Sequence, residues 1–172
     1  GTVQLERINR SHMVLIPKKP GAVEVGAFRP ICLQNCSVKI AAKILTTRLQ
    51  SEISSLIDLD QTGFLKGRTI VENFVYAAEL LQACHKRRVP TLVLKLDFAK
   101  AFDTVNWDSL VAIMEVRGFS EQWKGWINKL LCTSHTAVLV NGSPGPWITC
   151  KRGLRQGDPI LPYLFLLVAD VL

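Results

Sequence analysis

The polypeptide is 172 residues long, with 48% hydrophobic and 20% charged residues, which is the size and composition of one ordinary globular domain and excludes a disordered tail. A chain of this length buries roughly 70% of the surface that it exposes when unfolded, so its stability requires neither disulfides nor a structural metal. The five cysteines are odd in number and lack the paired spacing of zinc ligands, so we interpret them as reduced intracellular thiols.

The excess of basic residues favours a partner that carries phosphate groups. The formal net charge is +7 and the pI is about 9.4, a balance that suits phosphate. The alternative is that each cluster only solvates an exposed loop. The sequence shows neither a secretory signal nor a membrane-spanning run, so we expect an intracellular protein, nuclear or cytoplasmic, without a membrane partner. The basic residues form four clusters: Lys18-Lys19, Lys66 with Arg68, Lys86-Arg87-Arg88, and Lys151-Arg152 with Arg155.

The first half of the chain predicts one strand and two helices. The apolar residues 13–16 predict a short strand that runs into a basic loop. Apolar residues then recur at steps of three and four, which predicts a helix that is capped by Ser37 and ends near Leu56. A second helix is predicted to begin at Thr69, where the threonine hydroxyl and the Glu72 carboxylate would form a capping box. The buried stripe of the first helix is expected to be Val38, Ala41, Leu45, Leu49, Ile53 and Leu56.

The second half of the chain intermixes strands and helices. Residues 91–97 alternate between leucine and other side chains, which predicts a strand that ends at Asp97. Asp158 and Pro159 suit the cap and the first position of a final apolar helix. The predicted fold class is therefore α+β. Two further helices and the two strands of an Asn-Gly hairpin are predicted at residues 107–117, 121–132, 136–140 and 147–150.

Asp97 is a candidate ligand for a hard cation. At the end of a strand, a carboxylate is held on a rigid element and presented to a cleft, as Mg²⁺ requires of its ligands. Two alternatives stay open from the residues alone. The aspartate could only cap the following turn, or it could be the nucleophile of a phosphotransferase that forms an aspartyl-phosphate. The phosphotransferase hypothesis is weakened because Ala99 stands where such enzymes usually carry a second aspartate.

The segment 152–159 is a second candidate site. Gly153 and Gly157 let the backbone approach a ligand closely, and Arg152 and Arg155 supply positive charge at a predicted helix start. This pattern predicts a site for phosphate or sugar. The alternative is a plain connection between the hairpin and the last helix.

Five segments in a fixed order carry a family resemblance. In chain order they read LIPKK, FRPI, QTGFLKGR, KLDFAKAFD and RQGDP. This order resembles the reverse transcriptase domain of non-LTR (LINE-type) retrotransposons, and the resemblance covers nearly the whole chain. It implies a partial right-hand polymerase, with the fingers at about residues 1–90 and an incomplete palm with associated fingers segments at about residues 91–172.

The resemblance implies roles for three residues around the predicted strand end. Asp97 resembles the first metal-binding aspartate of the family, which bridges two Mg²⁺ ions, and Phe98 would add its backbone carbonyl. In that family the ions lower the pKa of the primer 3′-hydroxyl and neutralise the leaving pyrophosphate. Phe102 resembles the aromatic residue beneath the incoming sugar, which selects deoxynucleotides. The alternative for Phe102 is ordinary core packing.

The resemblance also implies residues that bind the nucleotide and the nucleic acid. Arg29, with help from Lys18 or Lys19, resembles the fingers residues that hold the triphosphate, and guanidinium groups suit phosphate oxygens. Gln156 and Gly157 resemble the motif that contacts the incoming nucleotide and the template side. The residues expected to bind nucleic acid are Lys66, Arg68, Arg152 and Arg155.

The expected function is that of a fragment of an RNA-directed DNA polymerase, which transfers a nucleotide from dNTP to a primer 3′-hydroxyl on an RNA template. RNA template, DNA primer and dNTP are the partners expected of the complete domain, and the sequence predicts no particular protein partner. The Tyr-x-Asp-Asp motif of the family is missing from these 172 residues, and one aspartate cannot fix two Mg²⁺ ions, so we expect the chain alone to be inactive. The alternative is a non-catalytic, nucleic-acid-binding remnant of a retroelement with weak, salt-sensitive binding.

Overall fold

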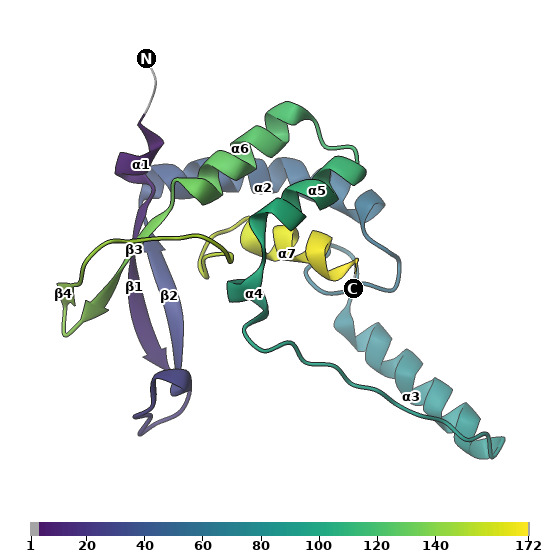
Figure 1. The fold of residues 1–172 in the computed structure, drawn as a ribbon. Helices are drawn as coiled ribbons and strands as arrows, with labels where there is room; N and C mark the ends of the chain where they lie inside the picture. Colours follow the sequence, from purple (N-terminus) through teal and green to yellow (C-terminus); the bar gives the residue numbers. More distant parts are fainter. Residues whose placement is uncertain (1–3, 172) are drawn as a thin grey trace.

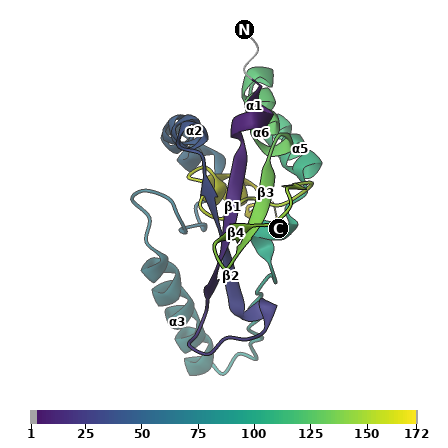
Figure 2. The same ribbon diagram turned by 90° about the vertical axis from the view of Figure 1, so that its left-hand side faces the viewer.

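The structure is a computed structural model that describes residues 4–171. A mixed β-sheet stands at one side, with the helices beside it (Figures 1 and 2), and the predicted α+β class is confirmed. The strands are β1 (Arg10–Pro17), β2 (Phe28–Gln34), β3 (His135–Val140), β4 (Ser143–Pro144) and β5 (Ile148–Thr149). The helices are α1 (Leu5–Ile8), α2 (Cys36–Leu56), α3 (Ile70–Lys86), α4 (Ala101–Thr104), α5 (Trp107–Val116), α6 (Glu121–Cys132) and α7 (Leu161–Ala169), with a 3-10 turn, η1, at Val25–Ala27.

The sheet is arranged around β1, which has a neighbour on each edge. β1 and β2 form an antiparallel hairpin whose register runs from Ser11 opposite Gln34 to Pro17 opposite Phe28. On its other edge β1 pairs in parallel with β3, and β3 in turn pairs with β4 and β5. The predicted strand at residues 13–16 and the predicted Asn-Gly hairpin are therefore both confirmed.

The hydrophobic core lies between α2, α5, α6 and α7. The buried stripe of α2 differs from the predicted one in its middle, where Ala42 and Thr46 are buried and Ala41 is exposed. Thr46 is tolerated inside because its hydroxyl donates to the Ala42 carbonyl at 2.7 Å. No helix within residues 4–171 is long and apolar enough to cross a membrane. The other helices contribute the fully buried side chains Leu110, Met114, Ile127, Leu164 and Leu167.

Two predicted helix caps are wrong and one prediction of a helix start is confirmed. α2 is capped by Asn35 and not by Ser37, because the Asn35 carboxamide accepts a hydrogen bond from the Ser37 amide at 2.9 Å. At the start of α3 the Thr69 side chain makes no capping hydrogen bond, so the predicted capping box is not formed. α6 begins as predicted, since the Ser120 hydroxyl accepts from the Trp123 amide at 3.3 Å.

The last helix begins later than predicted. α7 starts at Leu161 and carries Pro162 in its first turn, whereas the sequence pattern favoured Pro159 as the first helical residue. The reason lies in Asp158, whose Oδ1 accepts from the Ile160 amide at 3.2 Å and so closes a local turn before the helix.

The predicted strand at residues 91–97 is wrong. Residues 91–98 form no strand, and the side chains of Leu92 and Leu94 are 92% and 75% exposed. An alternating segment becomes a strand only where a neighbouring backbone supplies hydrogen bonds, and no strand within residues 4–171 pairs with it. The preceding helix, α3, buries no residue either. Both segments therefore project away from the rest of the chain (Figure 1).

Candidate functional site

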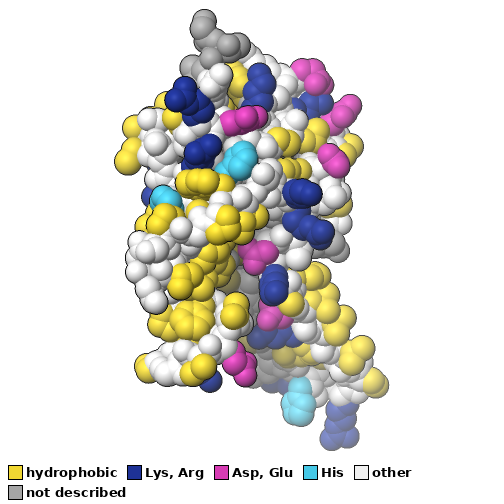
Figure 3. Space-filling model, turned by 60° about the vertical axis from the view of Figure 1, so that its left-hand side comes forward, with side chains coloured by type: hydrophobic (Ala, Val, Ile, Leu, Met, Phe, Trp, Pro, Cys, Tyr) yellow, Lys and Arg dark blue, Asp and Glu magenta, His cyan; other side chains and the backbone are white. Residues whose placement is uncertain are grey.

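The β1–β2 hairpin carries three predicted phosphate-binding cations near its turn. Lys18 closes the hairpin, because its amide donates to the Ala27 carbonyl at 2.8 Å and its Nζ donates to the Gly26 carbonyl at 2.9 Å. Lys19 and Arg29 are exposed beside it. Basic side chains are also scattered over the face shown in Figure 3, with hydrophobic side chains between them. The end of the hairpin therefore offers Lys19 and Arg29 to an anion in solution.

The RQGDP segment docks on β2, far from it in sequence. The Cys32 amide donates to the Gln156 carbonyl at 2.9 Å, and the Gln34 side chain donates through Nε2 to Oδ2 of Asp158 at 3.1 Å. Gly157 has a φ of +106°, and a β-carbon there would lie 2.9 Å from the Cys32 carbonyl oxygen. Only glycine fits this close approach. The backbone of the predicted nucleotide-binding loop is thus fixed against the FRPI segment.

The same loop also docks on α4 and the residues after it. The Leu154 amide donates to the Phe102 carbonyl at 2.8 Å, and the Gly153 amide donates to the Val105 carbonyl at 2.8 Å. A β-carbon on Gly153, whose φ is +79°, would lie 2.5 Å from the Asp103 carbonyl oxygen. The loop is therefore wedged between β2 and the KLDFAKAFD segment, and glycine is required at both contacts.

A cavity of about 130 Å³ forms where these three segments meet. Asp103, Arg152 and Gln156 line it together with Cys32 and Thr136. Burial raises the pKa of the Cys32 thiol, although hydrogen bonding with Thr136 and the positive charge of Arg155 act in the opposite direction. The residues that line the cavity thus include an aspartate, an exposed arginine and a glutamine.

A family model described as reverse transcriptase (RNA-dependent DNA polymerase) matches residues 16–172. The chain belongs to the reverse transcriptase family. Three motifs that are far apart in this reverse transcriptase sequence meet around one cavity within the matched residues. The resemblance to the reverse transcriptases of non-LTR retrotransposons is confirmed by its relatives.

Several curated relatives are proteins of transposable elements. The chain is 30% identical over 161 residues to the "Transposon TX1 uncharacterized 149 kDa protein" of Xenopus laevis, covering 94% of the chain and 12% of that protein. It is 29% identical over 160 residues to the "Retrovirus-related Pol polyprotein from type-1 retrotransposable element R2" of Nasonia vitripennis, covering 93% and 15%. It is 30% identical over 163 residues to the "Retrovirus-related Pol polyprotein from type-2 retrotransposable element R2DM" of Drosophila melanogaster, covering 95% and 15%. The reverse transcriptase chain thus spans 12–15% of the length of these relatives.

Asp97 and Phe98, the predicted metal ligands of this reverse transcriptase, lie in the exposed segment before α4. Within residues 4–171 no ion pair engages the Asp97 carboxylate. A carboxylate and a carbonyl are the hard oxygen donors that Mg²⁺ prefers, so this pair fits the ion as part of a ligand set. In the described part of the chain, no group of three or more His, Cys, Asp or Glu side chains could hold a metal.

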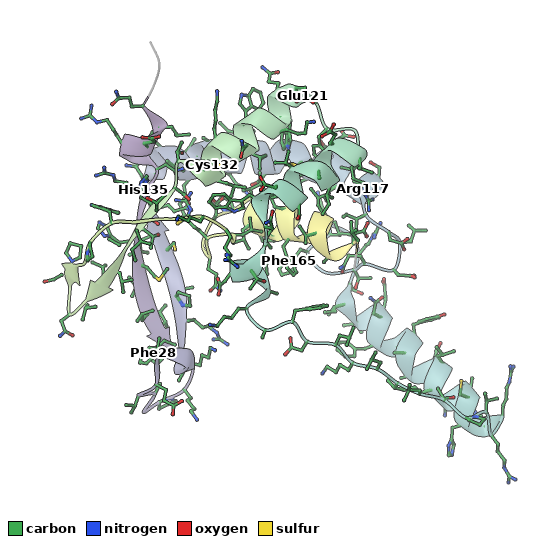
Figure 4. All side chains as sticks on the ribbon, viewed as in Figure 1. Phe28, Arg117, Glu121, Cys132, His135 and Phe165 are labelled. Carbon is green, nitrogen blue, oxygen red and sulfur yellow. The ribbon has the colours of Figure 1, made fainter. Side chains whose placement is uncertain are left out.

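Phe102 packs against the helices and also adjoins the loop. Its ring lies 4.4 Å from that of Phe165, centroid to centroid, at an angle of 44°, and Figure 4 labels Phe165 on α7. The ring is partly buried on the edge of the core. The core packing that the sequence left open as an alternative is therefore observed, and the contact with the incoming sugar stays a prediction.

The QTGFLKGR segment lies apart from the cavity and uses its arginine to shape its own loop. Arg68 Nη1 donates to the carbonyls of Asp58 at 2.6 Å and Gln61 at 2.7 Å. Lys66 is exposed and lines a separate hollow with Gln50. Contacts of Lys66 and Arg68 with nucleic acid stay predictions, and the guanidinium of Arg68 already has partners in the protein.

Sequence reasoning missed two residues that organise the site, Gln34 and Asn9, and left the role of Asp103 open. From the sequence, Asp103 was expected either to cap the helix near Trp107 or to lie at the rim of the site. Asn106 caps that helix, and Asp103 lines the cavity while its carbonyl packs on Gly153. Gln34 and Asn9 bind the side chains of Asp158 and Arg155, respectively. These partners are more than 120 residues apart, so no local pattern signals them.

Proposed function

We propose that this chain supplies the nucleotide-binding and first metal-binding elements of an RNA-directed DNA polymerase. The complete enzyme transfers a deoxynucleotide from dNTP to the 3′-hydroxyl of a DNA primer paired with an RNA template. The observation that carries the proposal is the hydrogen bond from the Cys32 amide to the Gln156 carbonyl. This bond ties the RQGDP loop to the strand that bears Arg29, so that both family motifs belong to one rigid unit.

The cationic β1–β2 hairpin and the RQGDP loop bind different parts of the nucleotide. Lys18, Lys19 and Arg29 bind the triphosphate, for which a guanidinium fork and ammonium groups are suited. Gln156 and Gly157 contact the incoming nucleotide and the template side, where the closely packed loop backbone is held in place. Because backbone hydrogen bonds hold the hairpin and the loop, the backbone segments that carry these groups do not have to be ordered when the triphosphate binds.

Asp97 and the backbone carbonyl of Phe98 would hold magnesium in the complete enzyme. Bound Mg²⁺ lowers the pKa of the primer hydroxyl and offsets the charge of the leaving pyrophosphate. Asp97 is exposed to receive such an ion. The 172 residues supply one strong carboxylate at this point, and the charge of two Mg²⁺ ions requires more. We therefore propose that this polypeptide alone does not extend a primer.

The test of the metal role is primer extension by the complete polymerase polypeptide that contains these residues. Asp97→Asn keeps the size of the side chain and removes its charge, and extension should fall at least about 100-fold. Asp108→Asn, an exposed change on α5, is the matched control and should leave the rate within about twofold. Undiminished extension by the Asp97→Asn enzyme would overturn the metal role.

A second measurement tests the hairpin in the chain itself. Binding of a fluorescent dNTP should weaken about tenfold in Arg29→Ala, because one charge-assisted phosphate contact is lost. Arg7→Ala removes the same charge from α1 and serves as the control. If both variants lose affinity equally, only the net charge matters and the assignment of Arg29 is wrong.

A further inference from the structure

An open apolar groove lies between α1, α2 and α6, outside the site described above. Its cavity volume is about 370 Å³, which falls in the roughly 300–1,000 Å³ range of ligand-binding clefts. Leu5 and Ile8 of α1 form one wall, Ile44 and Leu45 of α2 form another, and Trp126 of α6 stands at the edge. Figure 2 shows α2 on one side of the molecule and α1 with α6 on the other, at the same end.

α2 turns a second stripe towards this groove, in addition to its core stripe, and this stripe consists of three apolar residues followed by an arginine. Ala41, Ile44, Leu45 and Arg48 are spaced at i, i+3, i+4 and i+7, which is one face of a helix. Ile44 is 56% exposed, although isoleucine is among the residues most often buried. The stripe has the spacing of a helix-packing surface. Leu45 is partly buried against the core, whereas Ala41 and Ile44 are exposed.

The charges around the groove are of one sign. Arg48 and Lys129 are its only charged lining residues among those that the structure describes. The Arg48 guanidinium lies over the Trp126 ring, 5.9 Å from its centroid, a contact that holds the cation at the rim. An occupant therefore needs an apolar face with acidic residues beside it.

We propose that this groove docks an amphipathic helix with acidic flanks, contributed by the part of the same polypeptide that precedes residue 4. Helices laid into apolar grooves bind through residues at i, i+3, i+4 and i+7, the spacing that α2 offers. The curated relatives leave 85–88% of their own length outside the match, so such polypeptides hold ample sequence beyond this domain. Leu5 lines the groove, so a helix upstream of Leu5 in the same polypeptide needs only a short linker to reach it, which gives a high effective concentration.

A designed probe tests the chemistry of the groove. The probe is a peptide of about 18 residues, five helical turns, with a leucine stripe and glutamate flanks, and a second peptide has lysine flanks. The chain should bind the glutamate peptide more tightly. Arg48→Glu combined with Lys129→Glu should lower that affinity about tenfold, whereas the equal charge change Lys39→Glu with Lys86→Glu should leave it within about twofold. Equal binding of both peptides, or equal losses in both variants, would overturn the acidic flank.

Thiol protection tests the source of the helix. Ile44→Cys places a thiol in the groove, and Thr47→Cys places one on an exposed side of α2 that does not line it. Alkylation is followed at each thiol by mass spectrometry, in the 172-residue chain and in the polypeptide that includes its preceding residues. The longer polypeptide should slow labelling of the Ile44→Cys thiol about tenfold and leave the Thr47→Cys thiol unchanged. Equal labelling of the Ile44→Cys thiol in both would show that the groove is not filled by this segment and would overturn the proposal.

Discussion

The guanidinium of Arg155 donates through Nη2 to the Oδ1 atom of Asn9, 2.8 Å away and 146 residues earlier in the chain. Asn9 is fully buried, and its amide donates to the Leu130 carbonyl at 2.7 Å and to the Thr133 hydroxyl at 2.8 Å. These bonds join the RQGDP loop to the end of α6, which Cys132 marks in Figure 4. One buried side chain thereby holds the candidate nucleotide loop to the helical core.

Loss of the Asn9 carboxamide should destabilise the chain measurably. Asn9→Ala leaves the Leu130 carbonyl and the Arg155 guanidinium without their buried partner, and each such loss costs about 1–3 kcal/mol. We expect urea unfolding to show a decrease in the free energy of unfolding of about 2–6 kcal/mol, the sum of the two losses. Asn128→Ala removes an exposed carboxamide from α6 and should change the free energy of unfolding by less than about 0.5 kcal/mol. Equal effects of the two changes would mean that the buried network does not stabilise the fold.

The glycine contact between the loop and α4 gives a second prediction. Gly153 and Gly118 have nearly the same φ, +79° and +78°. A β-carbon added to Gly153 would lie 2.5 Å from the Asp103 carbonyl oxygen, whereas one added to Gly118 would meet no atom within 4 Å. Gly118→Ala should cost about 1–2 kcal/mol, the strain of a left-handed residue. Gly153→Ala adds a clash with the Asp103 backbone, so thermal unfolding should show a clearly larger loss of stability for this variant than for Gly118→Ala. Similar losses at the two positions would show that the loop moves aside easily.

The buried thiol predicts a fall in stability at alkaline pH. Burial raises the pKa of the Cys32 thiol above its ordinary value of 9.0. The unfolded chain then releases this proton at lower pH than the folded chain, so the contribution to stability is complete below pH 9.0 and is lost as the pH rises above it. The free energy of unfolding, measured with urea, should decrease from about pH 8 to about pH 10. This decrease should be smaller for Cys32→Ala than for the parent chain. Cys132→Ala, an exposed change, should retain the decrease of the parent.

The sequence predicted the elements that owe their form to local signals. The Asn-Gly turn between β3 and β4 has positive φ at both Asn141 and Gly142, and such a turn follows from the two residue types alone. The Ser120 cap of α6 and the glycine after α5 are signals of the same local kind. The family motifs could also be recognised from the sequence, because their order along the chain is itself a linear pattern.

What the sequence did not predict depends on partners from distant segments. Residues 91–97 have the alternation of a strand, yet no neighbouring strand within residues 4–171 pairs with them. The stripe of α2 shifted because Thr46 satisfies its hydroxyl within the helix and so can be buried. The roles of Asn9 and Asp103 arise only where loops meet in space. Propensity and period cannot signal contacts of this kind.

Arg68 and Lys66 were predicted to act alike on nucleic acid, and the structure separates them. Arg68 donates through Nη1 to the Asp58 and Gln61 carbonyls and through Nη2 to the Ser54 carbonyl. Lysine has one nitrogen and cannot reproduce donors that stand on two nitrogens of a planar fork. Arg68→Lys should therefore lower the free energy of unfolding by about 1 kcal/mol and speed amide hydrogen exchange in the loop between α2 and α3. Lys66→Ala should leave stability within about 0.5 kcal/mol, because that side chain is exposed.

Binding of single-stranded RNA at several salt concentrations completes this comparison. Lys66→Ala should weaken binding and reduce the slope of log affinity against log salt by about 1, as the loss of one phosphate contact does. Arg68→Lys keeps the positive charge, so its salt slope should stay that of the parent chain. If Arg68→Lys instead weakens RNA binding while unfolding and exchange are unchanged, its guanidinium contacts the nucleic acid and the carbonyl bonds are incidental. The two variants thus distinguish a residue that shapes the loop from one that meets the phosphate backbone.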